Sequence, residues 1–140
     1  MTAVEVAEKK SRWRAVGFLS LAVLTLTVMV VDTSGRSNDF LQGLWFGLIL
    51  GSALNLLPLK RMLRPRDEVL KLMDDEGTRE NRRLSSTAGF WAAVVAAMAL
   101  GLYSRSSDAI DAWMVGQLVA TAAMVSAMVT FGLLELRAAR

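Results

Sequence analysis

Few side chains in the apolar stretches of this 140-residue chain are able to do chemistry. Asn55 is the most polar side chain deep in the second apolar stretch, and Gln117 lies near the start of the fourth. Each carries an amide that both donates and accepts hydrogen bonds, so each can bond a neighbouring helix or contact a ligand. Arg14 and Glu135 lie at the ends of the first and fourth stretches, where long side chains reach a polar surface. We therefore interpret Asn55 and Gln117 as possible ligand contacts.

A dense patch of mixed charge precedes the third apolar stretch, in the sequence MDDEGTRENRR. Its charged members are Asp74, Asp75, Glu76, Arg79, Glu80, Arg82 and Arg83. Charges of both signs so close together favour recognition of a protein partner by electrostatic complementarity. We interpret the patch as a partner-binding surface. The simpler interpretation is that the basic residues bind anionic lipid.

The composition excludes several kinds of chemistry. The chain has no Cys, so it forms no disulfide and offers no thiolate. It has no His, the commonest metal ligand and the usual titrating group near neutral pH. We therefore predict no catalytic site, no metal site and no cofactor, and no direct contact with nucleic acid.

Four long apolar stretches must position these residues. They span about residues 13–31, 40–59, 84–103 and 110–136. Crossing the hydrocarbon layer of a membrane takes about 20 apolar residues in a helix. A soluble helical bundle would need a polar face on each helix, whereas residues 17–31 contain only Ser and Thr as polar types. The sequence predicts an all-α, integral membrane four-helix bundle that forms a single domain over 1–140.

The central segment, residues 60–83, separates the second and third predicted spans. Met62, Val69, Leu70 and Met73 recur at helical spacing among basic residues. This pattern is typical of a short amphipathic helix that lies on a membrane surface. We therefore predict such a helix on the cytoplasmic face.

The basic residues also predict an orientation. All Lys and Arg residues except Arg36 and Arg105 lie in the N-terminal, central or C-terminal segments. Lys and Arg near span ends favour the cytoplasmic side. We predict a multi-pass protein of the bacterial inner (plasma) membrane with both termini in the cytoplasm.

Small residues recur at intervals of four along the predicted spans. The second span carries Gly43, Gly47, Gly51 and Asn55, the third carries Gly89, Ala93, Ala97 and Gly101, and the fourth includes Gly116. In lipid, small residues let helix backbones approach closely. We predict that these stripes are helix-packing surfaces, either within one chain or against a second copy.

The segment around Glu76, Thr78, Arg79 and Glu80, placed just before a third span, resembles small uncharacterised four-span bacterial membrane proteins. Those proteins often accompany helix-turn-helix repressors, and some such pairs work by holding the regulator at the membrane. Typical members have Asp-Glu-Arg where this chain has Asp75, Glu76 and Gly77.

Three functions follow as hypotheses. The resemblance and the charged patch favour a non-catalytic regulatory membrane protein that binds a cytoplasmic partner, such as a transcription regulator. The glycine stripes favour an accessory subunit or a homo-oligomeric scaffold of a membrane complex. A small transporter or lipid-ligand binder would use Asn55 and Gln117.

Overall fold

The structure, a computed structural model, describes residues 3–36, 39–56, 76–106 and 111–138. These residues form helices and contain no β-strand. The elements are α1 (Ala3–Val31), the π-helical turn η1 (Asp32–Arg36), α2 (Asp39–Leu56), α5 (Glu76–Ser106) and α6 (Ala112–Ala138). For the described residues, the prediction of an all-α protein is confirmed.

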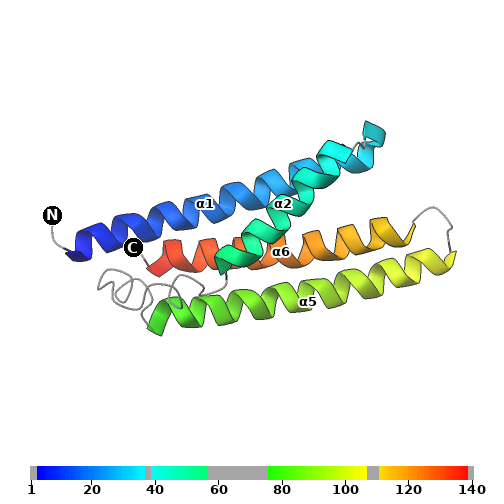
Figure 1. The fold of residues 1–140 in the computed structure, drawn as a ribbon. Coiled ribbons are helices and arrows are strands. Elements are labelled where there is room, and N and C mark those ends of the chain that lie inside the picture. Colours follow the sequence, from blue (N-terminus) through cyan, green and yellow to red (C-terminus); the bar gives the residue numbers. More distant parts are fainter. Residues whose placement is uncertain (1–2, 37–38, 57–75, 107–110, 139–140) are drawn as a thin grey trace.

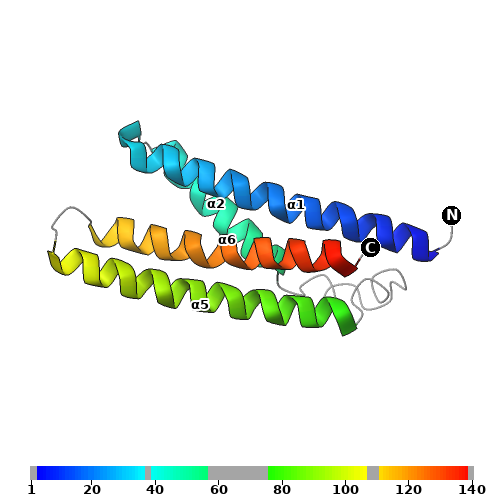
Figure 2. The same cartoon turned by 180° about the vertical axis from the view of Figure 1, so that it is seen from behind.

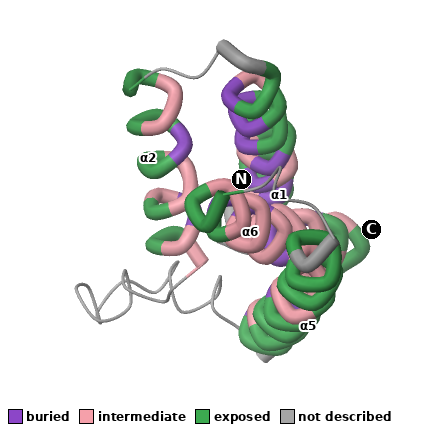
Figure 3. The backbone as a smooth tube through the Cα atoms, turned by 90° about the vertical axis from the view of Figure 1, so that its right-hand side faces the viewer, coloured by how far each residue is buried: buried purple, intermediate pink, exposed green. Residues whose placement is uncertain are grey.

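α6 is the central helix of the molecule. Helices α1, α5 and α6 run side by side, and α2 crosses them obliquely (Figures 1 and 2). Viewed along its length, α6 lies between α1, α2 and α5 (Figure 3), and it contacts all three. Both chain termini lie at the end where α5 begins, which we call the termini end. The opposite end, where α1 passes into η1 and α6 begins, we call the loop end.

Three of the described helices are long and apolar enough to cross a membrane. The qualifying segments are Ser11–Ser34, Gly77–Ser104 and Ala112–Ala138. α2 is not among them, because its 18 residues include Asp39, Gln42 and Asn55. Of the expected span over 40–59, the structure describes the part in α2, up to Leu56, and residues 57–59 lie outside the described residues. The structure indicates a membrane protein with three candidate spans.

Two boundaries differ from the sequence-based expectation. α5 begins at Glu76, so Arg79–Arg83 lie in the first turns of a long helix that continues into the apolar stretch. The polar segment after the first span is also partly helical, because η1 extends α1 to Arg36. The predicted amphipathic helix around Met62, Val69, Leu70 and Met73, like Asp74 and Asp75, lies outside the described residues.

The buried residues of α1 follow a coiled-coil spacing. α1 and the first residue of η1 bury side chains at alternating intervals of three and four: Ala15, Phe18, Ala22, Thr25, Met29 and Asp32. Val28, beside Met29, is buried as well. This average of 3.5 residues keeps one seam facing a neighbouring helix over many turns. The partner is α6, where Gln117, Thr121, Met128, Phe131 and Glu135 are buried with the same spacing.

These two rows of buried residues pack against each other with α1 and α6 antiparallel, and we call their interface the α1–α6 seam. Phe18 and Phe131 pack edge to face with ring centroids 5.0 Å apart, and Ala22 and Met128 complete this cluster. Nearer the loop end, Val28 and Met29 pack around Trp45 of α2. The middle of the bundle is thus an apolar core that joins α1, α2 and α6.

Two glycines permit close approach of the helices. A Cβ added at Gly89 of α5 would lie 2.8 Å from the backbone oxygen of Ala123, and one at Gly132 of α6 would lie 2.9 Å from Leu19 Cγ. Both positions are buried. Gly89 is therefore a helix-packing residue between α5 and α6. Gly132, which the sequence analysis did not single out, has the same role between α1 and α6.

The other predicted stripe residues lie elsewhere. A Cβ added at Gly43, Gly47, Gly51, Gly101 or Gly116 would meet no atom of the described residues within 4 Å. Ala97 and Asn55 are exposed, and Ala93 is half-buried. Each step of four residues turns a helix about 40° beyond one full turn, so a strict four-residue stripe winds away from a contact face. Close packing of these five glycines against the described residues is therefore not observed. Packing against a second copy stays a prediction.

The outward faces of the helices suit lipid. Large apolar side chains are exposed along α1 and α5, among them Val23, Val30, Phe90, Val95 and Leu102. Hydroxyl groups on the same helices bond to their own backbone; for example, Thr27 Oγ1 donates to Val23 O at 2.9 Å. Such bonds satisfy polar groups where no water is available. Exposed surfaces of this kind are typical of a membrane environment rather than of a water-soluble monomer.

The glycine geometry predicts opposite effects for two alanine substitutions. Gly89→Ala should lower the free energy of unfolding by about 1–3 kcal/mol, because the added methyl group meets backbone that must shift. Gly47→Ala should leave it unchanged or raise it by up to about 1 kcal/mol, since Ala is the better helix former. Denaturant unfolding in detergent, followed by circular dichroism, measures both. Equal effects of the two substitutions would contradict the packing described here.

Candidate functional site

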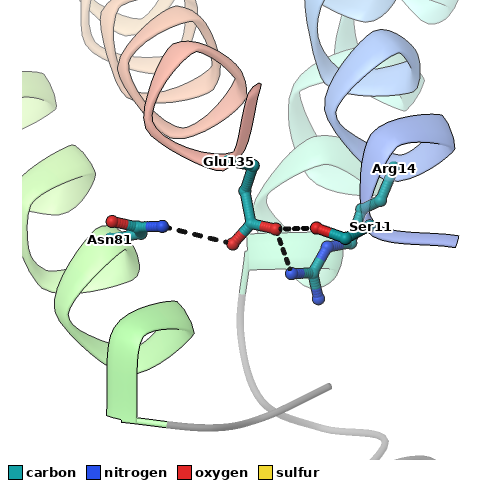
Figure 4. A network of polar contacts seen from close by, with 4 residues as sticks. All are labelled: Ser11, Arg14, Asn81 and Glu135. Atoms are coloured by element: carbon teal, nitrogen blue, oxygen red, sulfur yellow. Dashed lines mark hydrogen bonds and ion pairs between the residues drawn. The ribbon is translucent and has the colours of Figure 1, made fainter. Parts of the chain in front are cut away.

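A buried carboxylate ties three helices together at the termini end. Glu135 of α6 is 2% exposed. Its Oε2 accepts hydrogen bonds from Ser11 Oγ and, at 2.8 Å, from Arg14 Nη2, both on α1. Its Oε1 accepts a hydrogen bond from Asn81 Nδ2 of α5 at 3.4 Å (Figure 4). A single side chain thus receives donors from the helices on both sides of α6.

The charge of Glu135 is balanced by Arg14. The two side chains form an ion pair in which 3% of the Glu135 side chain and 22% of the Arg14 side chain are exposed. The Arg14 guanidinium also lies 5.2 Å from the centroid of the Phe131 ring, within the range of a cation–π contact. The sequence analysis expected both residues to reach the polar surface separately; instead they pair across the α1–α6 seam.

The charged first turns of α5 lie on the same part of the helix as Asn81. Arg79, Glu80 and Arg83 are exposed, and Glu80 lies 3.8 Å from Arg83 in a surface ion pair. Arg82 is half-buried. Thr78 and Ser85 are buried, so α5 turns one face to the bundle and presents charges on the other. Arg79, Glu80 and Arg83 belong to the patch that the sequence analysis interprets as partner-binding, and we refer to these three residues as the docking surface.

A second buried polar contact closes the loop end. Gln117 Nε2 of α6 donates to Asp32 Oδ2 at 2.7 Å. Asp32 is 6% exposed, although it directly follows the predicted span over 13–31. One turn further along α6, Thr121 Oγ1 accepts a hydrogen bond from Trp45 Nε1 at 2.9 Å. These contacts join η1 and α2 to α6.

The two predicted ligand-contact residues do not come together. Gln117 is buried at the loop end against Asp32. Asn55 is exposed near the other end of α2, and its Nδ2 donates to Gly51 O of its own helix at 2.9 Å. The structure therefore assigns Gln117 an interhelical hydrogen bond, and it gives Asn55 a bond within α2 rather than one across helices.

Sequence reasoning missed the polar contacts of the seam, although it had a usable signal. Arg14 and Glu135 lie near the same membrane surface in antiparallel spans, and their opposite charges indicate a pair. Asp32 was missed because an acidic residue that follows an apolar run is equally compatible with two locations: the membrane surface and a contact between helices. The described residues contain no group of three acidic side chains able to hold a metal ion.

Comparisons of this chain with models of known protein families, with curated proteins and with solved structures give no match. The function must therefore be inferred from the geometry of the chain itself.

The Glu135 contacts predict that the free energy of unfolding depends strongly on the ion pair between Glu135 and Arg14. Glu135→Leu should lower the free energy of unfolding by about 3–5 kcal/mol, because Arg14 is left partly buried without its counter-charge. The double variant Arg14→Leu/Glu135→Leu should lose much less, since neither charge remains. Denaturant unfolding in detergent compares the two, with Glu80→Gln as a control at an exposed carboxylate. A double variant as unstable as the single one would show that the ion pair is not what Glu135 contributes.

Proposed function

We propose that this chain is a non-catalytic, regulatory membrane protein that binds a cytoplasmic protein through the docking surface on α5. A transcription regulator is the partner class that the sequence resemblance favours. Asp74, Asp75, Glu76 and Arg82, which adjoin the docking surface in the sequence, belong to the same proposed interface. The supporting observation is that α5 continues without a break from Arg79, Glu80 and Arg83 into its apolar length.

Because α5 is continuous, the docking surface is part of the same helix that packs against the bundle. The exposed charges Arg79, Glu80 and Arg83 extend from a helix that packs on α6 through Gly89. Asn81, between them, bonds the buried Glu135. A partner that engages these charges thus binds a part of the helix that is directly connected to the bundle core. Fixed charges of both signs favour the binding of a protein with complementary charges over the binding of a uniformly basic or acidic surface.

We also propose the membrane arrangement that the docking surface requires. In it, α2 and the residues that follow Leu56 complete a fourth span, as the apolar sequence to residue 59 predicts. The termini end, where the basic residues concentrate, faces the cytoplasm of a bacterial inner membrane. Arg36 and Arg105 then lie on the opposite side.

A second candidate function is assembly of copies of this chain into an oligomeric scaffold or with a larger membrane complex. It is favoured by α2, where Gly43 and Gly47 are exposed and open to close approach by another helix. In that case α2 would contact α1 and α6 on one face and a second polypeptide on the other.

The proposed orientation is testable because the natural chain has no Cys. Single variants Arg36→Cys and Glu80→Cys, in spheroplasts of the producing cell, should react differently with a membrane-impermeant maleimide. We expect labelling at position 36 in intact spheroplasts, and at position 80 only after the membrane is opened. Equal labelling of both positions in intact spheroplasts would contradict the arrangement.

Docking is tested by site-specific photocrosslinking in the cell, with a photoreactive amino acid at position 83. We expect a discrete adduct with one soluble protein, identified by mass spectrometry, and its loss by about tenfold or more on Arg79→Glu, because reversing a charge in a complementary interface costs several kcal/mol. The matched control places the photoreactive group at Val95, which is exposed on the same helix and should crosslink to lipid or membrane protein. The absence of a soluble adduct at position 83, or its persistence in Arg79→Glu, would refute the docking surface.

A further inference from the structure

Three aromatic rings gather at the loop end, far from the docking surface. Trp45 and Phe46 of α2 have ring centroids 5.0 Å apart. Trp113 of α6 lies 6.2 Å from Trp45 and 5.5 Å from Phe46. Phe46 is 52% exposed and Trp113 is 45% exposed, whereas Trp45 is buried. Two of the three rings therefore remain open to a molecule that arrives from outside.

A buried carboxylate belongs to the same end of the bundle. Asp32 Oδ2 is bonded by Gln117, but Oδ1 is buried without a hydrogen-bond partner. An unpartnered oxygen of this kind is costly, because its interactions with water are lost and nothing replaces them. Asp32 is also the charged member of a contact whose other member, Gln117, is neutral.

The aromatic rings and the carboxylate are neighbours through α6. Trp113, Gln117 and Thr121 follow one another at intervals of four, and residues at this spacing are adjacent on a helix surface. Gln117 holds Asp32, and Thr121 holds the indole N–H of Trp45. On α1, Met29 packs with Trp45 and lies about one turn from Asp32. We call Asp32, Trp45, Phe46, Trp113 and Gln117 the loop-end cluster.

We propose that the loop-end cluster binds a quaternary ammonium group. The faces of aromatic rings attract a cation through their quadrupole, and several rings together are a usual way to recognise such a group. A quaternary ammonium has no N–H, so it needs ring faces and a nearby negative charge rather than a hydrogen bond to Oδ1. Asp32 supplies that charge, because Gln117, one helical turn from Trp113 on α6, bonds its carboxylate. Asp32 is buried, so solvent screens its charge only weakly.

The structure gives each member a distinct part in binding. The half-exposed rings of Phe46 and Trp113 form the contact surface. Trp45 supports them from the buried side, with its N–H already engaged by Thr121. Gln117 orients the carboxylate. This site lies at the end opposite to the docking surface, so the inference does not depend on the proposed partner.

Intrinsic fluorescence of the full chain in a maltoside detergent tests the site. The variant Trp13→Phe/Trp91→Phe leaves Trp45 and Trp113 as the two remaining Trp residues, whose emission is excited selectively at long wavelength. Choline and tetramethylammonium should change this emission saturably, and 3,3-dimethyl-1-butanol, the neutral isostere of choline, should not. In the same background, Asp32→Asn should weaken choline binding by about tenfold or more, because the buried negative charge is removed. Glu80→Gln removes a carboxylate at the other end and should leave binding unchanged.

A second variant keeps the test decisive if Asp32→Asn does not fold. Trp113→Leu retains the carboxylate and should also abolish saturable binding, read by isothermal titration calorimetry. Nanodiscs distinguish the two sources of the ligand: competition by phosphatidylcholine but not by phosphatidylglycerol would assign the site to a lipid headgroup, and binding of free choline in both would assign it to a soluble cation. The proposal is overturned if the neutral isostere binds as well as choline, or if either Trp113→Leu or a folded Asp32→Asn binds choline normally.

Discussion

The α1–α6 seam is the constraint on which the rest of the structure depends. Its apolar middle supplies contact area, but in lipid such contact has no preference for one register over another, because the surrounding hydrocarbon is equally apolar. The hydrogen bonds at its two ends provide that preference. Glu135 meets Ser11 and Arg14 at one end, and Gln117 meets Asp32 at the other. A shift of one helix along the other would leave several of these groups buried without partners, which is costly in hydrocarbon.

The other two helices are added to this pair by different means. α2 is attached by Trp45, whose ring fills the space between α1 and α6 and whose N–H reaches Thr121. α5 is attached by the close backbone approach at Gly89 and by the bond from Asn81 to Glu135. Because α5 is anchored near its beginning, its charged first turns are held in a definite orientation relative to the seam. This fixed orientation is the geometric basis for the proposal that they bind a partner.

Much of the helical content was predictable, since apolar runs of about 20 residues leave few alternatives to a helix in lipid. The contact faces were harder to predict, because the sequence does not show which side of each helix is turned toward its neighbours. Gly43, Gly47 and Gly51 look like a stripe in the sequence, but the observed face of α2 is built around Trp45 and Ser52. Gly132 was overlooked because no small residue lies four positions before or after it, so it belongs to no stripe. Gln117 was considered without Asp32, and only the antiparallel register of α1 and α6 shows that the two residues meet.

The polar contacts at the two ends of the seam also fix the length of the apolar part of the bundle between them. Ser11 and Asp32 are 21 positions apart on a continuous helix, which corresponds to about 32 Å along its axis. This length is close to that of an average hydrocarbon layer, about 30 Å. Because the end contacts fix the register, the molecule has little freedom to change its hydrophobic length by sliding its helices. In a thicker or thinner bilayer, hydrophobic mismatch would have to be relieved by tilting the whole bundle or deforming the lipid around it. The chain is thereby matched to membranes of ordinary thickness.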